Sequence, residues 1–164
     1  MRDVKICLTI AGSDSGGGAG IQADIKAMQA TGVFAASVVT AITAQNTREV
    51  TAAYDLPVEL IDAQIDAVFD DFEIAAVKTG MLSSVEIIQT VAAQVQSRTM
   101  HPVVVDPVMI SKSGFKLLKD DAVDVLKSKL LPLAALVTPN AHEAVLLTGF
   151  DVQSEEDARK AAEA

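Results

Sequence analysis

Apolar runs alternate with amphipathic segments along the whole chain. Residues 4–10 are a largely apolar run typical of a buried strand, and residues 21–30 repeat apolar side chains at helical spacing. The same alternation predicts further strands at residues 37–44, 51–56, 74–78, 103–105 and 134–138. It predicts further helices that begin at Pro57, at Ser83 or Ser84, at Asp120 and Asp121, after Pro139 and Asn140, and at Ser154. We therefore expect an α/β fold, with a mostly parallel sheet and helices on both faces.

A glycine-rich segment joins the first predicted strand to the first predicted helix. The backbone N–H groups of such a turn, with the N-terminus of the helix, suit a polar or anionic ligand. A P-loop is excluded because Gly20 is followed by Ile21 and not by a Lys-Ser/Thr pair. The dinucleotide pattern G-x-G-x-x-A fits residues 18–23, but no acidic residue ends the next strand, where the first acid is Glu49. The segment thus predicts a ligand loop with a dinucleotide as the less favoured ligand, and a tight turn without a ligand is the alternative.

The residues that end the predicted strands are almost all polar, glycine or proline. In an open parallel sheet, ligands bind beyond the carboxyl ends of the strands. Here those ends carry Gly12, Gln45, residues 79–81, Asp106 with Pro107, and Asn140. This convergence predicts one composite site at that edge of the sheet.

Composition narrows the class of protein. The 164 residues suffice for one domain, half of them are hydrophobic, and only 4% are aromatic. Aliphatic side chains therefore fill the core, as is typical of buried parallel sheets. A net charge of −9 argues against nucleic acid as a partner. The single cysteine, Cys7, fits a reducing cytoplasm, and no apolar stretch is long enough to cross a membrane.

The last residues predict the start of a helix. Ser154 is a capping residue and three acids follow it, but the sequence stops at Ala164 without a basic last turn or a glycine. This favours a chain truncated at its C-terminus, with a frayed natural tail as the alternative. We therefore expect residues 1–164 to be the N-terminal part of a single domain.

Five segments, in this order, resemble bacterial hydroxymethylpyrimidine/phosphomethylpyrimidine kinases of the ribokinase-like superfamily. They are residues 8–24, 40–47, 78–82, 105–109 and 138–143. The resemblance implies a ribokinase-like three-layer fold and a cytoplasmic enzyme of thiamine biosynthesis. Such an enzyme uses ATP and Mg²⁺ to phosphorylate 4-amino-5-hydroxymethyl-2-methylpyrimidine and then its monophosphate, and a homodimer is common in the family.

The resemblance assigns five residues to the pyrimidine. Gly12 would lie against the ring, and Asp24 and Gln45 would be its polar partners. A glutamine amide suits an aminopyrimidine because it offers a donor and an acceptor on one side chain. Met81 and Val108 would form apolar walls, although a methionine at this position is also typical of a core.

Four more residues are assigned to phosphate and metal. Lys112 would lie near the phosphates, where a solvated lysine is the alternative. Asp106, Asn140 and Glu143 would lie near Mg²⁺ or its waters, because Mg²⁺ prefers oxygen ligands and keeps bound water. Asn140 and Glu143 also have the spacing of a helix capping pair, and Asp106 that of a turn residue at a strand end.

One part of the family pattern has no counterpart in this sequence. Family members carry a C-terminal glycine-rich motif that supplies an anion hole, a catalytic base and much of the nucleotide pocket. We therefore assign no catalytic base among these residues. The alternatives are a pyridoxine/pyridoxal kinase of the same superfamily and a fragment that binds the substrate without catalysis.

Overall fold

The chain forms a six-stranded sheet in the computed structural model, which describes residues 4–110, 117–119 and 121–164. The strand order is β3-β2-β1-β4-β5-β6, and all neighbours are parallel except β2 and β3. The strands are β1 (Ile6–Asp14), β2 (Phe34–Gln45), β3 (Val50–Asp55), β4 (Ile74–Thr79), β5 (Val103–Val105) and β6 (Leu136–Val137). The predicted mostly parallel α/β sheet is confirmed.

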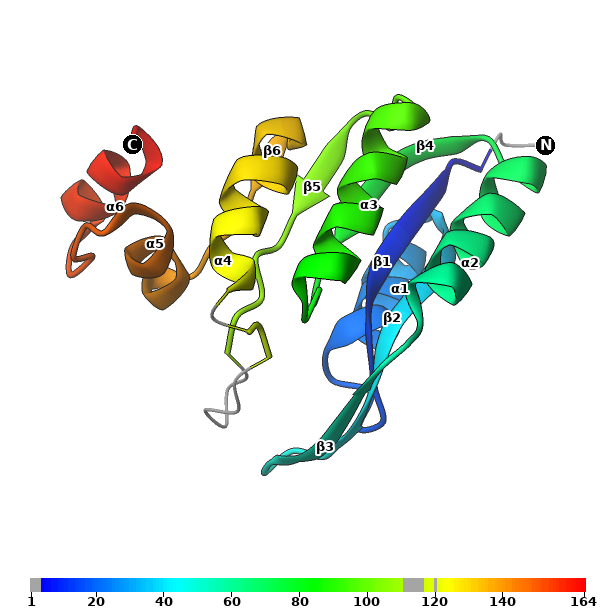
Figure 1. Ribbon diagram of the computed structural model, residues 1–164, viewed down its shortest axis with the longest axis horizontal. Coiled ribbons are helices and arrows are strands. Elements are labelled where there is room, and N and C mark those ends of the chain that lie inside the picture. The colour runs from blue at the N-terminus through cyan, green and yellow to red at the C-terminus, as the bar shows by residue number, and fades with distance from the viewer. Residues whose placement is uncertain (1–3, 111–116, 120) are drawn as a thin grey trace.

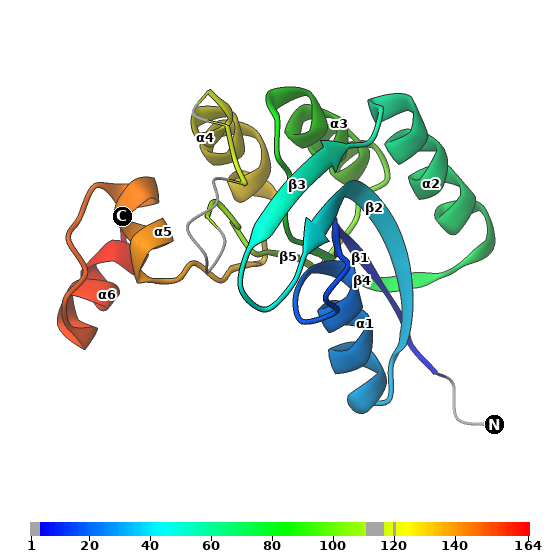
Figure 2. The same ribbon diagram turned by 90° about the horizontal axis from the view of Figure 1, so that it is seen from below.

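Helices cover both faces of this sheet, as Figure 2 shows. Helix α1 (Gly20–Ala30) lies on one face, and α2 (Val58–Asp71), α3 (Val85–Ser97) and α4 (Ala122–Val125) lie on the other. Helices α5 (Ala141–Thr148) and α6 (Glu155–Ala162) follow β6 and lie beyond that edge of the sheet (Figure 1). None of the helices in the described part of the chain is long and apolar enough to cross a membrane.

The main core lies between the sheet and α2, α3 and α4. Leu8 and Ile10 of β1 are fully buried there, as are Ile61 and Ile65 of α2. Side chains alternate along a strand, so Thr9 lies on the opposite face, where it reaches α1. Full burial of each large aliphatic side chain contributes about 1.5–3 kcal/mol, so these strands and helices are held mainly by this layer.

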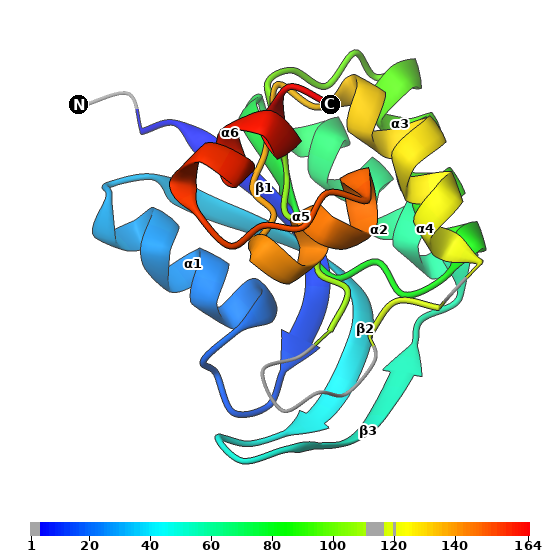
Figure 3. The same ribbon diagram turned by 90° about the vertical axis from the view of Figure 1, so that its left-hand side faces the viewer.

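The strand order places a topological switch point at β1. The chain passes from β1 to β2 on one side and returns through β4 on the other side. Ligands in such folds bind where neighbouring strands diverge in this way. The ribbon of β2 and β3 extends past the other strands at this end of the sheet (Figures 1 and 3).

Several boundaries differ from the predicted ones. Strand β1 runs four residues past its predicted end, because Ser13 and Asp14 pair with β2 after a shift in register. Pro57 caps α2 instead of opening it, and β6 keeps only two residues. The helix predicted after residue 120 continues from α4 as a π-helical segment, Leu126–Leu130, and a 3₁₀ turn, Leu131–Leu133. Pro132 in that turn has no N–H to donate, so regular α-helical bonding cannot continue there.

Candidate functional site

The glycine-rich turn is organised by the carboxylate of Asp14. Its Oδ1 accepts a hydrogen bond from the N–H of Gly16 (2.7 Å), and its Oδ2 accepts from Gly18 (2.9 Å) and Ala19 (2.8 Å). Asp14 is only 5% exposed. These three N–H groups therefore already have an anionic acceptor within the chain and are not free for a ligand.

Gly20 closes this turn against β1. Its φ is +56°, and a Cβ at this position would lie 2.2 Å from the carbonyl oxygen of Gly12. Both features require glycine, since a side chain meets fixed backbone and the left-handed region disfavours other residues. In this part of the segment the alternative of a tight turn is therefore the correct one.

Gln45 is held at the end of β2 by the turn. The hydroxyl of Ser15 donates to the carbonyl of Gln45 (2.7 Å) and accepts from its N–H (2.8 Å). The hydroxyl of Thr43, which has one proton to donate, lies 3.0 Å from the carbonyl oxygen of Ser13 and 3.2 Å from Oε1 of Gln45. A half-buried amide is thus positioned beside the carboxyl end of β1, as the composite-site hypothesis requires.

Gly12 and Met81 are in contact across the switch point. A Cβ on Gly12 would lie 3.2 Å from Sδ of Met81, so the missing side chain leaves room for the thioether. Met81 is 7% exposed, and its carbonyl accepts a hydrogen bond from Thr40 Oγ1 (2.8 Å). Val108 is half-buried beyond β5. Of the predicted apolar residues Gly12, Met81 and Val108, the structure therefore places the first two in contact.

Lys78 joins two predicted site residues that are distant in sequence. Its Nζ lies 3.1 Å from Asp24 and 3.4 Å from Asp106, and Thr9 donates a 2.6 Å hydrogen bond to the same Asp24 oxygen. The side chains of Lys78 and Asp24 are 21% and 17% exposed. Lys78 had no predicted role, although it stands in one of the five segments that carry the resemblance. Its position at the end of a buried strand was the signal for it.

Asn140 and Glu143 form the capping box of α5. The side chain of Asn140 accepts from the N–H of Glu143 (3.0 Å), and Glu143 Oε2 accepts from the N–H of Asn140 (2.9 Å). The other oxygen of Glu143 accepts from Met109 N–H at 3.4 Å. The capping alternative is confirmed, and both carboxylate oxygens of this buried acid already have partners.

Of the three residues predicted near Mg²⁺, Asp106 has a carboxylate outside the capping box, where it pairs with Lys78. The described residues contain no group of three or more His, Cys, Asp or Glu side chains that could hold a metal ion. Mg²⁺ needs no such cage, because it often binds through one or two carboxylates, substrate phosphates and water. Asp106, whose side chain is 34% exposed, suits that arrangement better than Glu143. Lys112, the predicted phosphate ligand, lies outside the described residues.

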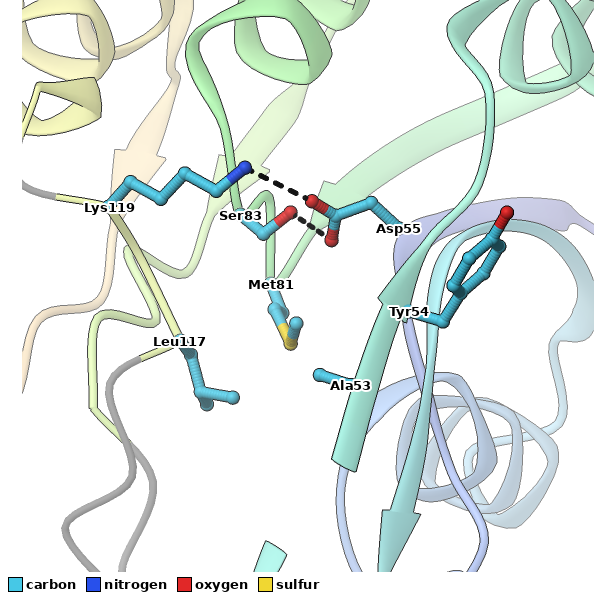
Figure 4. A pocket seen from close by; sticks show the side chains of 7 residues that line it. All are labelled: Ala53, Tyr54, Asp55, Met81, Ser83, Leu117 and Lys119. Atoms are coloured by element: carbon cyan, nitrogen blue, oxygen red, sulfur yellow. Dashed lines mark hydrogen bonds and ion pairs between the residues drawn. The ribbon is translucent and has the colours of Figure 1, made fainter. Parts of the chain in front are cut away.

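A hollow of about 320 Å³ lies beside Met81 (Figure 4). Its lining is completed by Ala53, Tyr54, Asp55, Ser83, Leu117 and Lys119. Among the predicted site residues in the described part of the chain, Met81 alone lines this hollow. The volume falls at the lower end of the range for small-molecule sites. Asp55, Ser83 and Lys119 escaped the sequence analysis because none of them ends a parallel strand.

Residues 14–164 match the family model described as phosphomethylpyrimidine kinase. The chain belongs to this family. It is 53% identical over 159 residues to the hydroxymethylpyrimidine/phosphomethylpyrimidine kinase of Streptomyces coelicolor, an alignment that covers 97% of this chain and 59% of that protein. The corresponding enzyme of Haemophilus influenzae is 51% identical, with coverage of 100% and 61%. The chain thus spans about three-fifths of the length of these relatives.

Solved structures agree with the family and the fold. The crystal structure of the phosphomethylpyrimidine kinase of Clostridium difficile superposes with a TM-score of 0.90 at 47% identity, covering 96% of this chain and 70% of that one. Bacillus subtilis pyridoxal kinase, solved as an ADP complex, gives a TM-score of 0.88 at 36% identity, covering 98% and 61%. The predicted ribokinase-like fold and the predicted family are therefore confirmed.

Proposed function

We propose that this chain supplies the pyrimidine-binding part of an ATP-dependent kinase of thiamine biosynthesis. The substrates are 4-amino-5-hydroxymethyl-2-methylpyrimidine and its monophosphate. The observation that carries the proposal is the pairing of a held amide, Gln45, with the apolar contact of Gly12 and Met81 at one switch point. Membership of the phosphomethylpyrimidine kinase family supports the same reaction.

Gln45 is the group that recognises the ring. Thr43 Oγ1 lies beside Oε1 of Gln45, and we propose that the Nε2 group provides donors for an acceptor nitrogen of the pyrimidine. Gly12 lets the Met81 side chain pack against β1, and we propose that Met81 and Val108 form the two apolar walls for the ring. Asp24 is proposed as a further polar partner through its second oxygen, since Oδ2 is held by Thr9 and Lys78.

The phosphate side of the site is proposed to lie near Asp106. ATP is the expected phosphate donor for this family, and neighbours such as Staphylococcus aureus pyridoxal kinase were solved with AMP-PCP. We propose that Asp106 contacts Mg²⁺ or its waters, that Asn140 and Glu143 support it by capping α5, and that Lys112 contacts phosphate. A bound Mg²⁺ neutralises charge on the transferred phosphoryl group.

The extent of the domain, its cellular location and its oligomeric state are proposed from the same family resemblance. We propose that residues 1–164 are the N-terminal part of one kinase domain that acts in the cytoplasm and forms a homodimer. The acidic net charge of −9 supports a small-molecule substrate over nucleic acid. No membrane partner is proposed.

A pyridoxal kinase is the second candidate function. The similarity to the Bacillus subtilis pyridoxal kinase favours it, and pyridoxal shares a flat heteroaromatic ring with a hydroxymethyl arm. The higher identity to pyrimidine kinases, 53% against 36%, favours the first candidate.

Calorimetric titration with hydroxymethylpyrimidine and with pyridoxal tests both candidates. We expect saturable binding of the pyrimidine and a dissociation constant about tenfold higher in Gln45→Ala, the factor that one hydrogen bond of ordinary strength represents. Gln29→Ala, at an exposed position of α1, is the matched control and should bind as the parent chain does. Tighter binding of pyridoxal, or equal binding by Gln45→Ala, would refute the proposal.

A further inference from the structure

Asp55 ties three separate segments together at the edge of the hollow. Its Oδ1 accepts a 2.5 Å hydrogen bond from the hydroxyl of Ser83, and its Oδ2 lies 3.5 Å from Nζ of Lys119 (Figure 4). Asp55 ends β3, Ser83 lies between β4 and α3, and Lys119 precedes α4. One carboxylate therefore links the edge strand β3 to the loop before α3 and to the loop before α4.

Ser83 is the centre of this link. It is 6% exposed, and its carbonyl accepts the backbone N–H of Lys119 at 3.1 Å. Two residues earlier, the carbonyl of Met81 accepts the hydroxyl of Thr40 on β2. The short segment from Met81 to Ser83 is thus fastened at its start to β2 and at its end to β3 and Lys119.

The hydrogen bond from Ser83 outweighs the ion pair with Lys119. A short O–H to carboxylate bond with a buried donor is among the strong hydrogen bonds of proteins. Lys119 is 61% exposed, and ion pairs of exposed side chains contribute little to stability. The position of Ser83 should therefore depend mainly on the acceptor oxygen at residue 55 and only weakly on the ion pair with Lys119.

The apolar lining of the hollow lies beside this link. Ala53 shares a face of β3 with Asp55, because alternate residues of a strand point the same way. Figure 4 shows Ala53, Met81 and Leu117 around one space, with Tyr54 turned away from it. The bond between Asp55 and Ser83 therefore joins β3 to the segment that carries Met81.

We propose that Asp55 is a positioning residue that holds Met81 at the wall of the pyrimidine pocket by accepting the hydroxyl of Ser83. The inference rests on the proposed function for the identity of the ligand. The positioning of Met81 and Lys119 by residue 55 is inferred from the contacts alone and does not depend on the ligand. Asp55 acts through Ser83, so it should alter ligand affinity without touching the ligand.

The first test needs no ligand. Methionine methyl NMR reports the surroundings of Met81, and amide hydrogen exchange reports the bond from Lys119 N–H to Ser83. In Asp55→Ala we expect a shifted Met81 methyl signal and exchange at Lys119 about fivefold faster, as the loss of one ordinary hydrogen bond implies. Asp66→Ala, which breaks the ion pair of Asp66 with Arg98 away from the hollow, is the matched control and should change neither. An unchanged Met81 signal and unchanged exchange in Asp55→Ala would overturn the proposal.

The second test measures the affinity for hydroxymethylpyrimidine. We expect a dissociation constant about fivefold higher in Asp55→Ala and a smaller rise in Asp55→Asn, whose neutral amide oxygen still accepts from Ser83. Equal weakening by Asp55→Asn and Asp55→Ala would show that charge matters and would overturn the assignment. If the parent chain binds no pyrimidine, the proposed function fails, while the NMR and exchange results still decide the positioning role.

Discussion

Replacing Asp14 by alanine is expected to unfold the turn between β1 and α1. The carboxylate of Asp14 is the shared acceptor for the N–H groups of Gly16, Gly18 and Ala19. Alanine removes all three bonds at once and leaves the three N–H groups without their acceptor. The turn also carries Ser15, which holds Gln45, so the site should loosen together with the fold.

The expected loss follows from the number and type of these bonds. A hydrogen bond to a charged group contributes about 1.5–3 kcal/mol, and bonds that share one carboxylate are not additive. Because Asp14 is 5% exposed, water replaces it poorly, and we expect Asp14→Ala to lower the free energy of unfolding by about 3–5 kcal/mol. Asp14→Asn keeps one acceptor oxygen and places a donor among N–H groups, so it should cost about 2–3 kcal/mol.

Urea denaturation followed by circular dichroism measures these losses directly. Asp66→Ala is the control, since it removes a carboxylate that is 52% exposed and should cost less than about 1 kcal/mol. Calorimetry on the same variants tests whether the proposed binding of the pyrimidine depends on this turn. A loss in Asp14→Ala no greater than that of Asp66→Ala would refute the reasoning, because the three bonds would then contribute nothing beyond an exposed charge.

Two further predictions concern charged groups. Lys78→Met leaves the part-buried carboxylates of Asp24 and Asp106 without their shared cation, so urea denaturation should show a free energy of unfolding lower by about 1–3 kcal/mol. Adding Asp106→Asn should restore part of that loss. Equal stability of Lys78→Met and the parent would contradict this. The hydroxyl of Ser154 donates to Asp157 and lowers the pKa of that carboxyl below its ordinary value, so its contribution to α6 is fully present above the ordinary pKa and is lost as the pH falls through the lowered one. NMR titration should show a lowered pKa for Asp157 that returns toward the ordinary value in Ser154→Ala, and an unchanged pKa in that variant would exclude Ser154 as the cause.

Local signals in the sequence determined the order and type of the elements. The apolar run at residues 103–105 coincides with β5, Ser84 caps α3 as one of the two predicted serines, and Asn140 with Glu143 forms the predicted capping box. These features are readable because strand periodicity and helix caps depend on residues that are close in sequence. The family itself was recognisable for a related reason, since its motifs are short and occur in a fixed order.

The tertiary structure alone decided which side chains meet. The sequence predicted that the glycine-rich segment is a ligand loop, but the folded turn directs three of its N–H groups to Asp14. Asp24 and Asp106 were assigned to different ligands, yet Lys78 joins them, because β4 lies between β1 and β5 in the sheet. Asp55 reaches Ser83 only because β3 turns back along β2. Strand order and register bring together residues that no local pattern relates, so these contacts were beyond prediction from the sequence by itself.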